Sequence, residues 1–278
     1  MNCIVRKMEL PEIEIAMHLA YKEGWNPGLN DGIAFYNTDP QGFLLAEYKG
    51  RVVGTISAVN YGDGFGFIGF YIVDSDYRGT VVGTQLGMAA LNYLKDLNIG
   101  IDGVVARVEN YKRLGFREAY KNIRFEGVGD KYILEPEVVH AKIIDFQEIA
   151  DYDARCFPVR REKFLKGWLE MINSHSYVFY EENRVKGYGV IRSCRKGYKI
   201  GPLFADDIHI AEQIYKALAN KAADELIYFD TPEANLFAVD LAHKYEMKKV
   251  FETARMYTGE EPLIDLPKIF GVTSFELG

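Results

Sequence analysis

The sequence predicts a mixed α/β protein in which one strand–helix–strand pattern occurs twice. Apolar strand candidates alternate with amphipathic helices along both halves of the 278 residues. Short segments also recur in the same order, namely 49–54 with 182–187, 68–69 with 200–201, 101–102 with 229–230, and 125–127 with 257–259. This shared order favours duplication, with chance recurrence of strand–turn patterns as the alternative. We therefore predict two tandem domains, 1–130 and 138–278, with a Gly- and Pro-containing linker near 127–140.

The first half is predicted in more detail because its turn and helix-breaking residues are clear. Pro27 and its flanking glycines exclude a helix from the loop 24–28, and Lys49-Gly50 marks a tight hairpin. The apolar positions 86, 90, 94 and 97 recur at helical spacing. The predicted elements are strand 2–6, helix 12–22, strands 43–48, 52–60 and 65–73, helix 82–97, strand 101–106, a helical turn through Tyr111 and a strand pair near 116–127.

Composition excludes several classes of function. The net charge of −7 disfavours a nucleic-acid partner, which would be held mainly by Lys and Arg. The longest apolar run, 65–73, is far shorter than the ~20 residues that span a membrane, and the N-terminus shows no signal peptide. Three scattered cysteines indicate a reducing compartment. Five scattered histidines without paired ligand spacing predict that the protein has no structural metal. We expect a cytoplasmic protein, and the sequence leaves its oligomeric state open.

The segment 74–86 is the most informative for chemistry. It joins a strand candidate to a helix, where consecutive backbone N–H groups can bind phosphate oxygens. Arg78 would add a charge-assisted hydrogen bond. A plain strand-to-helix turn is the alternative. The predicted phosphate-binding residues are Arg78, Gly79, Thr80, Val81, Val82, Gly83 and Thr84.

This loop resembles the coenzyme A pyrophosphate loop of the GNAT superfamily of N-acetyltransferases. Arg78 and Gly83 match the first and last positions of the family pattern, and the segment 111–116 resembles its Tyr-x-x-Leu-Gly-Phe motif. Val81 departs from the usual Gly, and a β-branched residue disfavours positive φ, so we expect a loop that is slightly reshaped or binds less tightly. The resemblance implies acetyl-CoA as co-substrate, held by the backbone of Tyr71, Ile72 and Val73. It also implies that Tyr111 protonates the departing thiolate.

Further stretches of the chain, 24–28 with Asp31, 67–73 and 255–259, resemble tandem proteins of this family. The implied activity is direct transfer of an acetyl group to a small-molecule amine. A non-catalytic acyl-CoA-binding regulatory module is the alternative. In the second half, 204–211 lacks glycine and carries Asp206 and Asp207, so this domain should not bind coenzyme A.

The acceptor side is predicted from residue type alone. Trp25, Asn26, Asp31 and Asp230 are the candidate substrate-binding residues, because aromatic and acidic groups together suit a cationic amine. A hydrophobic anchor is the alternative role for Trp25. The candidate general bases are Glu23, Asp31, Asp102 and Asp230, each of which could equally be structural.

Overall fold

The strands of the protein form one continuous sheet. The structure is a computed structural model that describes residues 3 to 278. Its 13 strands follow the order β1-β2-β3-β4-β5-β12-β6-β11-β10-β9-β8-β7, with β13 paired to β10. The strands are β1 (Ile4–Lys7), β2 (Phe43–Tyr48), β3 (Arg51–Gly62), β4 (Phe65–Val73), β5 (Asn98–Val104), β6 (Arg117–Val128), β7 (Val138–His140), β8 (Ser174–Glu181), β9 (Arg184–Ser193), β10 (Tyr198–Ala205), β11 (Leu226–Pro232), β12 (Lys248–Tyr257) and β13 (Ile269–Gly271).

Eight α-helices cover the sheet. They are α1 (Ile13–Lys22), α2 (Asp31–Thr38), α3 (Val81–Tyr93), α4 (Val108–Arg113), α5 (Phe146–Cys156), α6 (Glu162–Leu169), α7 (Ile208–Ala219) and α8 (Leu236–Lys244). The halves meet where α2 packs on α6, with the Phe35 ring stacked 5.4 Å from that of Trp168. Within residues 3–278, every helix is too short or too polar to cross a membrane.

Most of the predicted elements of the first half are confirmed. The strands at 43–48 and 65–73 have the predicted bounds, and the others differ by a few residues. Residue 2 of the first predicted strand lies outside the described residues. Helix α2 was not predicted, because its buried face is short and includes Asp31. The strand pair predicted near 116–127 is wrong, since this segment is the single strand β6.

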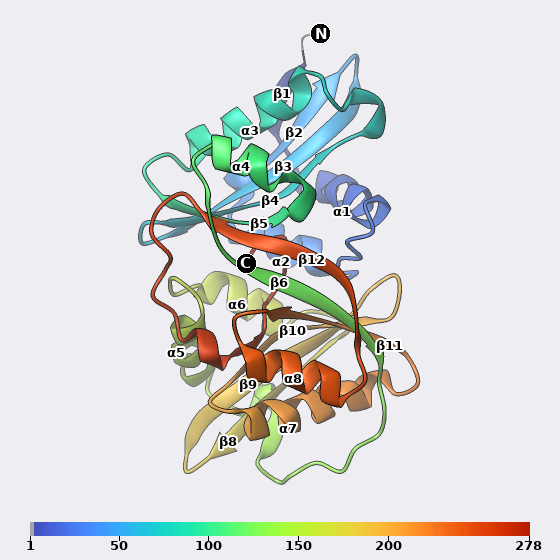
Figure 1. Cartoon of the computed structure of the whole chain (residues 1–278), viewed down its shortest axis with the longest axis vertical. Coiled ribbons are helices and arrows are strands. Elements are labelled where there is room, and N and C mark those ends of the chain that lie inside the picture. Colours follow the sequence, from blue (N-terminus) through green and yellow to red (C-terminus); the bar gives the residue numbers. More distant parts are fainter. Residues whose placement is uncertain (1–2) are drawn as a thin grey trace.

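The two halves exchange strands. β12, the last long strand of the second half, inserts between β5 and β6 of the first half. In return, β6 pairs with β11, so that each half completes the sheet of the other (Figure 1). The division of the chain into domains 1–130 and 138–278 remains a prediction. In the structure, one sheet contains strands from both of these segments.

A gap opens between two parallel strands of the first half. β4 and β5 pair from Phe65↔Asn98 to Ile68↔Ile101 and no further. Beyond this point β4 bulges, because Ile56 of β3 faces both Phe70 and Tyr71. Phe70 takes the unusual φ of 45°, and such strain is commonly found where backbone geometry serves a site. The bulge leaves the C-terminal ends of β4 and β5 splayed apart.

Candidate active site

Two adjoining cavities occupy the gap between β4 and β5. The inner cavity, about 540 Å³, is lined by Trp25, Ile68, Gly69, Phe70, Tyr71, Ile101, Asp102, Gly103, Val104, Tyr111, Phe251, Thr253 and Phe275. The outer cavity, about 1080 Å³, is lined by Glu23, Trp25, Tyr71, Ile72, Val73, Tyr77, Arg78, Gly79, Thr80, Gly83, Val104, Arg107, Asn110, Tyr111 and Leu114. The two cavities share Trp25, Tyr71, Val104 and Tyr111, so they form one continuous space.

The predicted phosphate loop borders the outer cavity. Arg78 Nε donates to the carbonyl of Val73 at 3.0 Å, and its Nη2 forms an ion pair with Glu23. Gly79 has a φ of 77°, which its lack of a side chain permits. Thr80 caps α3 only weakly, because the amide of Val82 lies 3.4 Å from its hydroxyl. The N-terminus of α3 therefore keeps N–H groups available for an anion.

The reason for expecting a reshaped loop, a positive φ at Val81, does not apply. Val81 is the first residue of α3 and has ordinary helical geometry, so its branched side chain meets no positive φ. Seven of the predicted coenzyme residues line the outer cavity, namely Tyr71, Ile72, Val73, Arg78, Gly79, Thr80 and Gly83. Val81, Val82 and Thr84 do not line it.

Tyr71 explains why glycine stands at position 83. Its hydroxyl donates to the Gly83 carbonyl at 2.7 Å. A Cβ at Gly83 would lie 3.2 Å from that hydroxyl, and one at Gly87 would lie 3.3 Å away. Larger residues would therefore push α3 away from β4. The side chain of Tyr71 fixes the distance between the strand and the helix that carries the loop.

Sequence reasoning missed two polar residues of the outer cavity, Arg107 and Asn110. Arg107 precedes α4, and Asn110 lies within it. Among residues 3–278, Arg107 forms no ion pair. A usable signal was present, because 107, 110, 111 and 114 recur at helical spacing and share one side of this turn.

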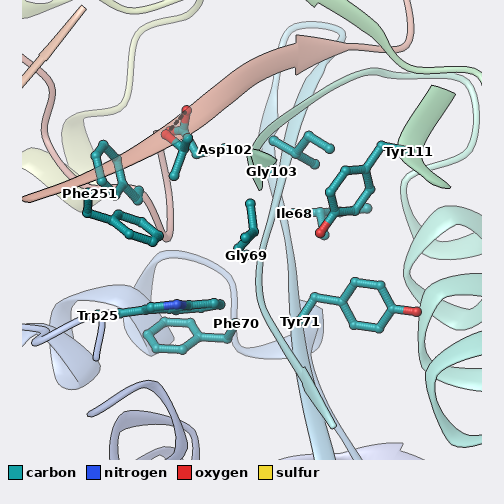
Figure 2. Close-up of a pocket in the computed structure, with 13 residues that line it drawn as sticks. Trp25, Ile68, Gly69, Phe70, Tyr71, Asp102, Gly103, Tyr111 and Phe251 are labelled. Atoms are coloured by element: carbon teal, nitrogen blue, oxygen red, sulfur yellow. Dashed lines mark hydrogen bonds between the residues drawn. The ribbon is translucent and has the colours of Figure 1, made fainter. Parts of the chain in front are cut away.

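Tyr111 lines both cavities. Its ring lies over Gly103 of β5, where an added Cβ would be 2.6 Å from the ring. Figure 2 shows its hydroxyl directed toward Ile68 of β4. Burial raises the pKa of Tyr111 to about 12, so the phenol keeps its proton at neutral pH. A proton donor therefore lies at the junction between the two cavities.

Aromatic side chains from distant segments form the far wall of the inner cavity. Trp25 comes from the loop after α1 and Phe251 from β12 (Figure 2). Phe275 comes from the C-terminal segment. The buried guanidinium of Arg124 lies behind them. It donates to the Trp25 carbonyl at 2.6 Å and stands 4.8 Å from the centre of the Phe275 ring.

Three of the predicted substrate residues have structural roles instead. Asp31 is fully buried, accepts from the Gly28 amide and pairs with Arg192 at 2.8 Å. Asp230 is equally buried and bound to Arg124. Asn26 binds both backbone groups of Lys196. None of the three lines either cavity, so the structure does not bring them together with Trp25 at the candidate site.

Trp25 and two of the proposed bases do border the cavities. Glu23 reaches the outer cavity, where it pairs with Arg78. Asp102 reaches the inner cavity, but Arg255 and Asn122 hydrogen-bond its carboxylate at 2.7 to 3.0 Å. The carbonyl of Trp25 is fixed by Arg124 and Lys199, which orients the loop that carries its indole.

Sequence comparison explains this geometry. Residues 10–116 match the acetyltransferase (GNAT) family model, and residues 149–271 match a second acetyltransferase (GNAT) domain model. The holothin acyltransferase of Pseudoalteromonas sp. (strain SANK 73390) is 31% identical over 271 residues, which is 97% of this chain and 92% of that protein. The chain belongs to the GNAT acyltransferase family.

Solved structures show the same tandem fold. A proposed acetyltransferase from Pyrococcus horikoshii superposes with a TM-score of 0.84 at 22% identity, over 99% of this chain and 96% of that one. A tandem GNAT protein of the clavulanic acid biosynthesis pathway superposes with a TM-score of 0.64 at 11% identity, over 94% and 100% of the chains. The predicted mixed α/β class with two GNAT-type halves is confirmed.

The second GNAT half has its corresponding gap filled. β10 and β11 pair from Tyr198↔Ile227 to Ile200↔Phe229, as β4 and β5 do. β13 then pairs with β10 at Leu203↔Gly271, and the next amide, that of Val272, donates to the carbonyl of Asp230 at 2.8 Å. The protein's own backbone therefore fills the gap between β10 and β11, whereas the corresponding gap between β4 and β5 remains open.

The N-terminus of α7, the helix that follows β10, is also unavailable to an anion. Asp207 caps α7 by accepting from the Ile210 amide at 2.9 Å. The neighbouring Asp206 pairs with Lys268 at 3.0 Å. A carboxylate of the chain thus occupies the N-terminus of α7, whereas the corresponding N-terminus of α3 in the first half is only weakly capped.

Proposed function

We propose that this protein transfers an acetyl group from acetyl-CoA to the amine of a small molecule, directly and within one ternary complex. One observation carries the proposal. The cavity beside the phosphate loop and the aromatic inner cavity meet at Tyr111. The similarity to an acyltransferase named for holothin supports a small molecule as acceptor.

The residues of the outer cavity suit coenzyme A. The free edge of β4 from Tyr71 to Val73 offers backbone groups to the pantetheine arm, and the N-terminus of α3 with Arg78 suits the pyrophosphate. Arg107, on the opposite wall, supplies a second cation for a phosphate. An edge amide beside the bulge would stabilise the oxyanion that forms during transfer.

The inner cavity would hold the acceptor so that its neutral nitrogen attacks the acyl carbon. A C–N bond forms, the C–S bond breaks, and the nitrogen gives up one proton while the departing sulfur gains one. Tyr111 donates that proton to the thiolate, and water returns the nitrogen's proton to the phenolate. The raised pKa of Tyr111 keeps the donor protonated until the thiolate forms.

Direct transfer is favoured because no cysteine borders the reaction space. The described residues place all three cysteines in buried positions, outside both cavities. Initial rates of thiol release should give intersecting lines when acetyl-CoA and the acceptor are varied together. Parallel lines would indicate a covalent acyl-enzyme. Binding of acetyl-CoA without thiol release in the presence of any amine would favour the regulatory module.

A further inference from the structure

We infer that the acceptor is a flat aromatic amine of low basicity, recognised by Trp25, Phe251 and Phe275. This inference rests on the proposed function and specifies its substrate class. It replaces the cationic amine that the sequence predicted, because the structure assigns the carboxylate of Asp31 to a buried ion pair with Arg192.

The shape of the inner cavity favours a flat molecule. Its far wall is built from ring faces, and the Phe251 and Phe275 centroids lie 6.2 Å apart. Aromatic faces bind planar rings by stacking or edge contacts, worth about 0.5–1.5 kcal/mol for each pair beyond area burial. The rest of the lining is mainly apolar, and its polar side chains are the phenols of Tyr71 and Tyr111, the paired Asp102 and Thr253. These leave few groups to bind the several hydroxyls of a sugar.

The charges around the inner cavity disfavour an ammonium ion. Asp102 is the one carboxylate among the described lining residues, and Arg255 already holds it in a bidentate ion pair. The cation of Arg124 lies 4.8 and 5.9 Å from the centres of the Phe275 and Phe251 rings. The other titratable lining groups are the phenols of Tyr71 and Tyr111. An ammonium would lose its hydration here, and the described lining residues offer it no carboxylate other than the paired Asp102.

The chemistry of transfer points the same way. A protonated alkylamine cannot attack until a base removes its proton, and the described lining residues supply no free carboxylate or histidine for this step. An aromatic amine is already neutral at physiological pH, because the ring delocalises its lone pair. Once the nitrogen has attacked, its proton becomes acidic enough for water to carry away.

Aniline and cyclohexylamine form a matched pair for the test. They have similar size, but only aniline is flat and neutral at pH 7. With acetyl-CoA saturating, we expect kcat/KM for aniline to exceed that for cyclohexylamine by at least about tenfold. The aniline value should stay constant through neutral pH, whereas that for cyclohexylamine should rise about tenfold per pH unit.

Aromatic wall variants test the recognition itself. Phe275→Leu should lower kcat/KM for aniline about tenfold while leaving the Kd for acetyl-CoA unchanged. Phe251→Leu provides the same test on a partly exposed residue if the first variant fails to fold. Phe237→Leu is the matched control, because Phe237 is 58% exposed on α8 and lines neither cavity.

The substrate class and the proposed transfer can fail separately. Equal or faster turnover of cyclohexylamine overturns the substrate class and leaves the proposed transfer standing. Unchanged aniline kinetics in both wall variants also overturns it. Thiol release with another amine but not with aniline likewise overturns the substrate class alone. Failure to bind acetyl-CoA, or binding without thiol release in the presence of any amine, overturns the proposed function and the inference together.

Discussion

Arg255 on β12 and Asp102 on β5 form a bidentate ion pair that joins the two halves of the chain. Nε and Nη2 lie 3.0 and 2.7 Å from the two carboxylate oxygens. The other half repeats the arrangement, with Arg124 on β6 bound to Asp230 on β11 at 2.7 Å through both oxygens. In each case the exchanged strand carries the arginine and the receiving strand carries the aspartate.

Breaking one of these pairs should destabilise the whole protein. Asp230→Asn would leave the guanidinium of Arg124 buried without its counter-charge, so we expect the free energy of unfolding to fall by about 3–5 kcal/mol. Urea denaturation measures this. Asp151→Asn removes an exposed partner of Arg160 and should cost less than about 1 kcal/mol. Equal losses in the two variants would show that the exchanged strand does not depend on its ion pair.

The sequence predicted the elements of the first half well, because their signals are local. Lys49-Gly50 and the strands beside it needed only turn chemistry and apolar patterning. The exchange of β6 and β12 could not be predicted. The apolar pattern of each of these strands is equally compatible with pairing to β5 or to β11. The buried ion pairs of Asp31 and Asp230 could not be predicted for the same reason. Their partners, Arg192 and Arg124, are 161 and 106 residues away, and only the fold brings them together.

Arg78 should contribute to acetyl-CoA binding in competition with Glu23. Arg78→Ala removes a charged hydrogen bond to phosphate, so we expect binding to weaken by about 1.5–3 kcal/mol. Glu23→Gln should have the opposite effect, because it frees Arg78 and removes a negative charge from the outer cavity. Calorimetric titration measures both. Weaker binding in Glu23→Gln would mean that Glu23 mainly holds Arg78 in position.

Coenzyme A should bind once per chain. The gap between β4 and β5 is open, whereas β13 fills the gap between β10 and β11. Calorimetry should therefore give a stoichiometry of one. Asp207→Ser would remove the capping carboxylate from α7 but leave β13 in place, so its stoichiometry should not change. A second site in this variant would show that charge alone closes the second half.

Tyr111→Phe separates an enzyme from a binding protein. It removes the proton donor but keeps the ring that packs over Gly103. We expect kcat to fall by ~10²–10⁴ while the Kd for acetyl-CoA stays within about twofold. Tyr93→Phe is the control, because its hydroxyl binds Asp39 away from both cavities. Full activity in Tyr111→Phe would leave water as the proton source for the thiolate.

Stability should fall steeply above pH 10, and buried tyrosines are the physical cause. Burial raises the pKa of Tyr111 from 10.0 to about 12 and moves the pKa values of Tyr120 and Tyr188 further in the same direction. The folded state therefore holds these protons more tightly than the unfolded chain does. Below pH 10 both states are protonated and stability is independent of these groups.

Between pH 10 and 12 the unfolded state ionises first, so each buried phenol lowers the free energy of unfolding by about 1.4 kcal/mol per pH unit. Urea denaturation across this range should show the decline, and the near-ultraviolet absorbance of tyrosinate should rise together with the loss of structure. Tyr111→Phe should decline less steeply than the wild type. Gradual ionisation of the buried tyrosines at pH 10, with the fold intact, would contradict the burial of these phenols.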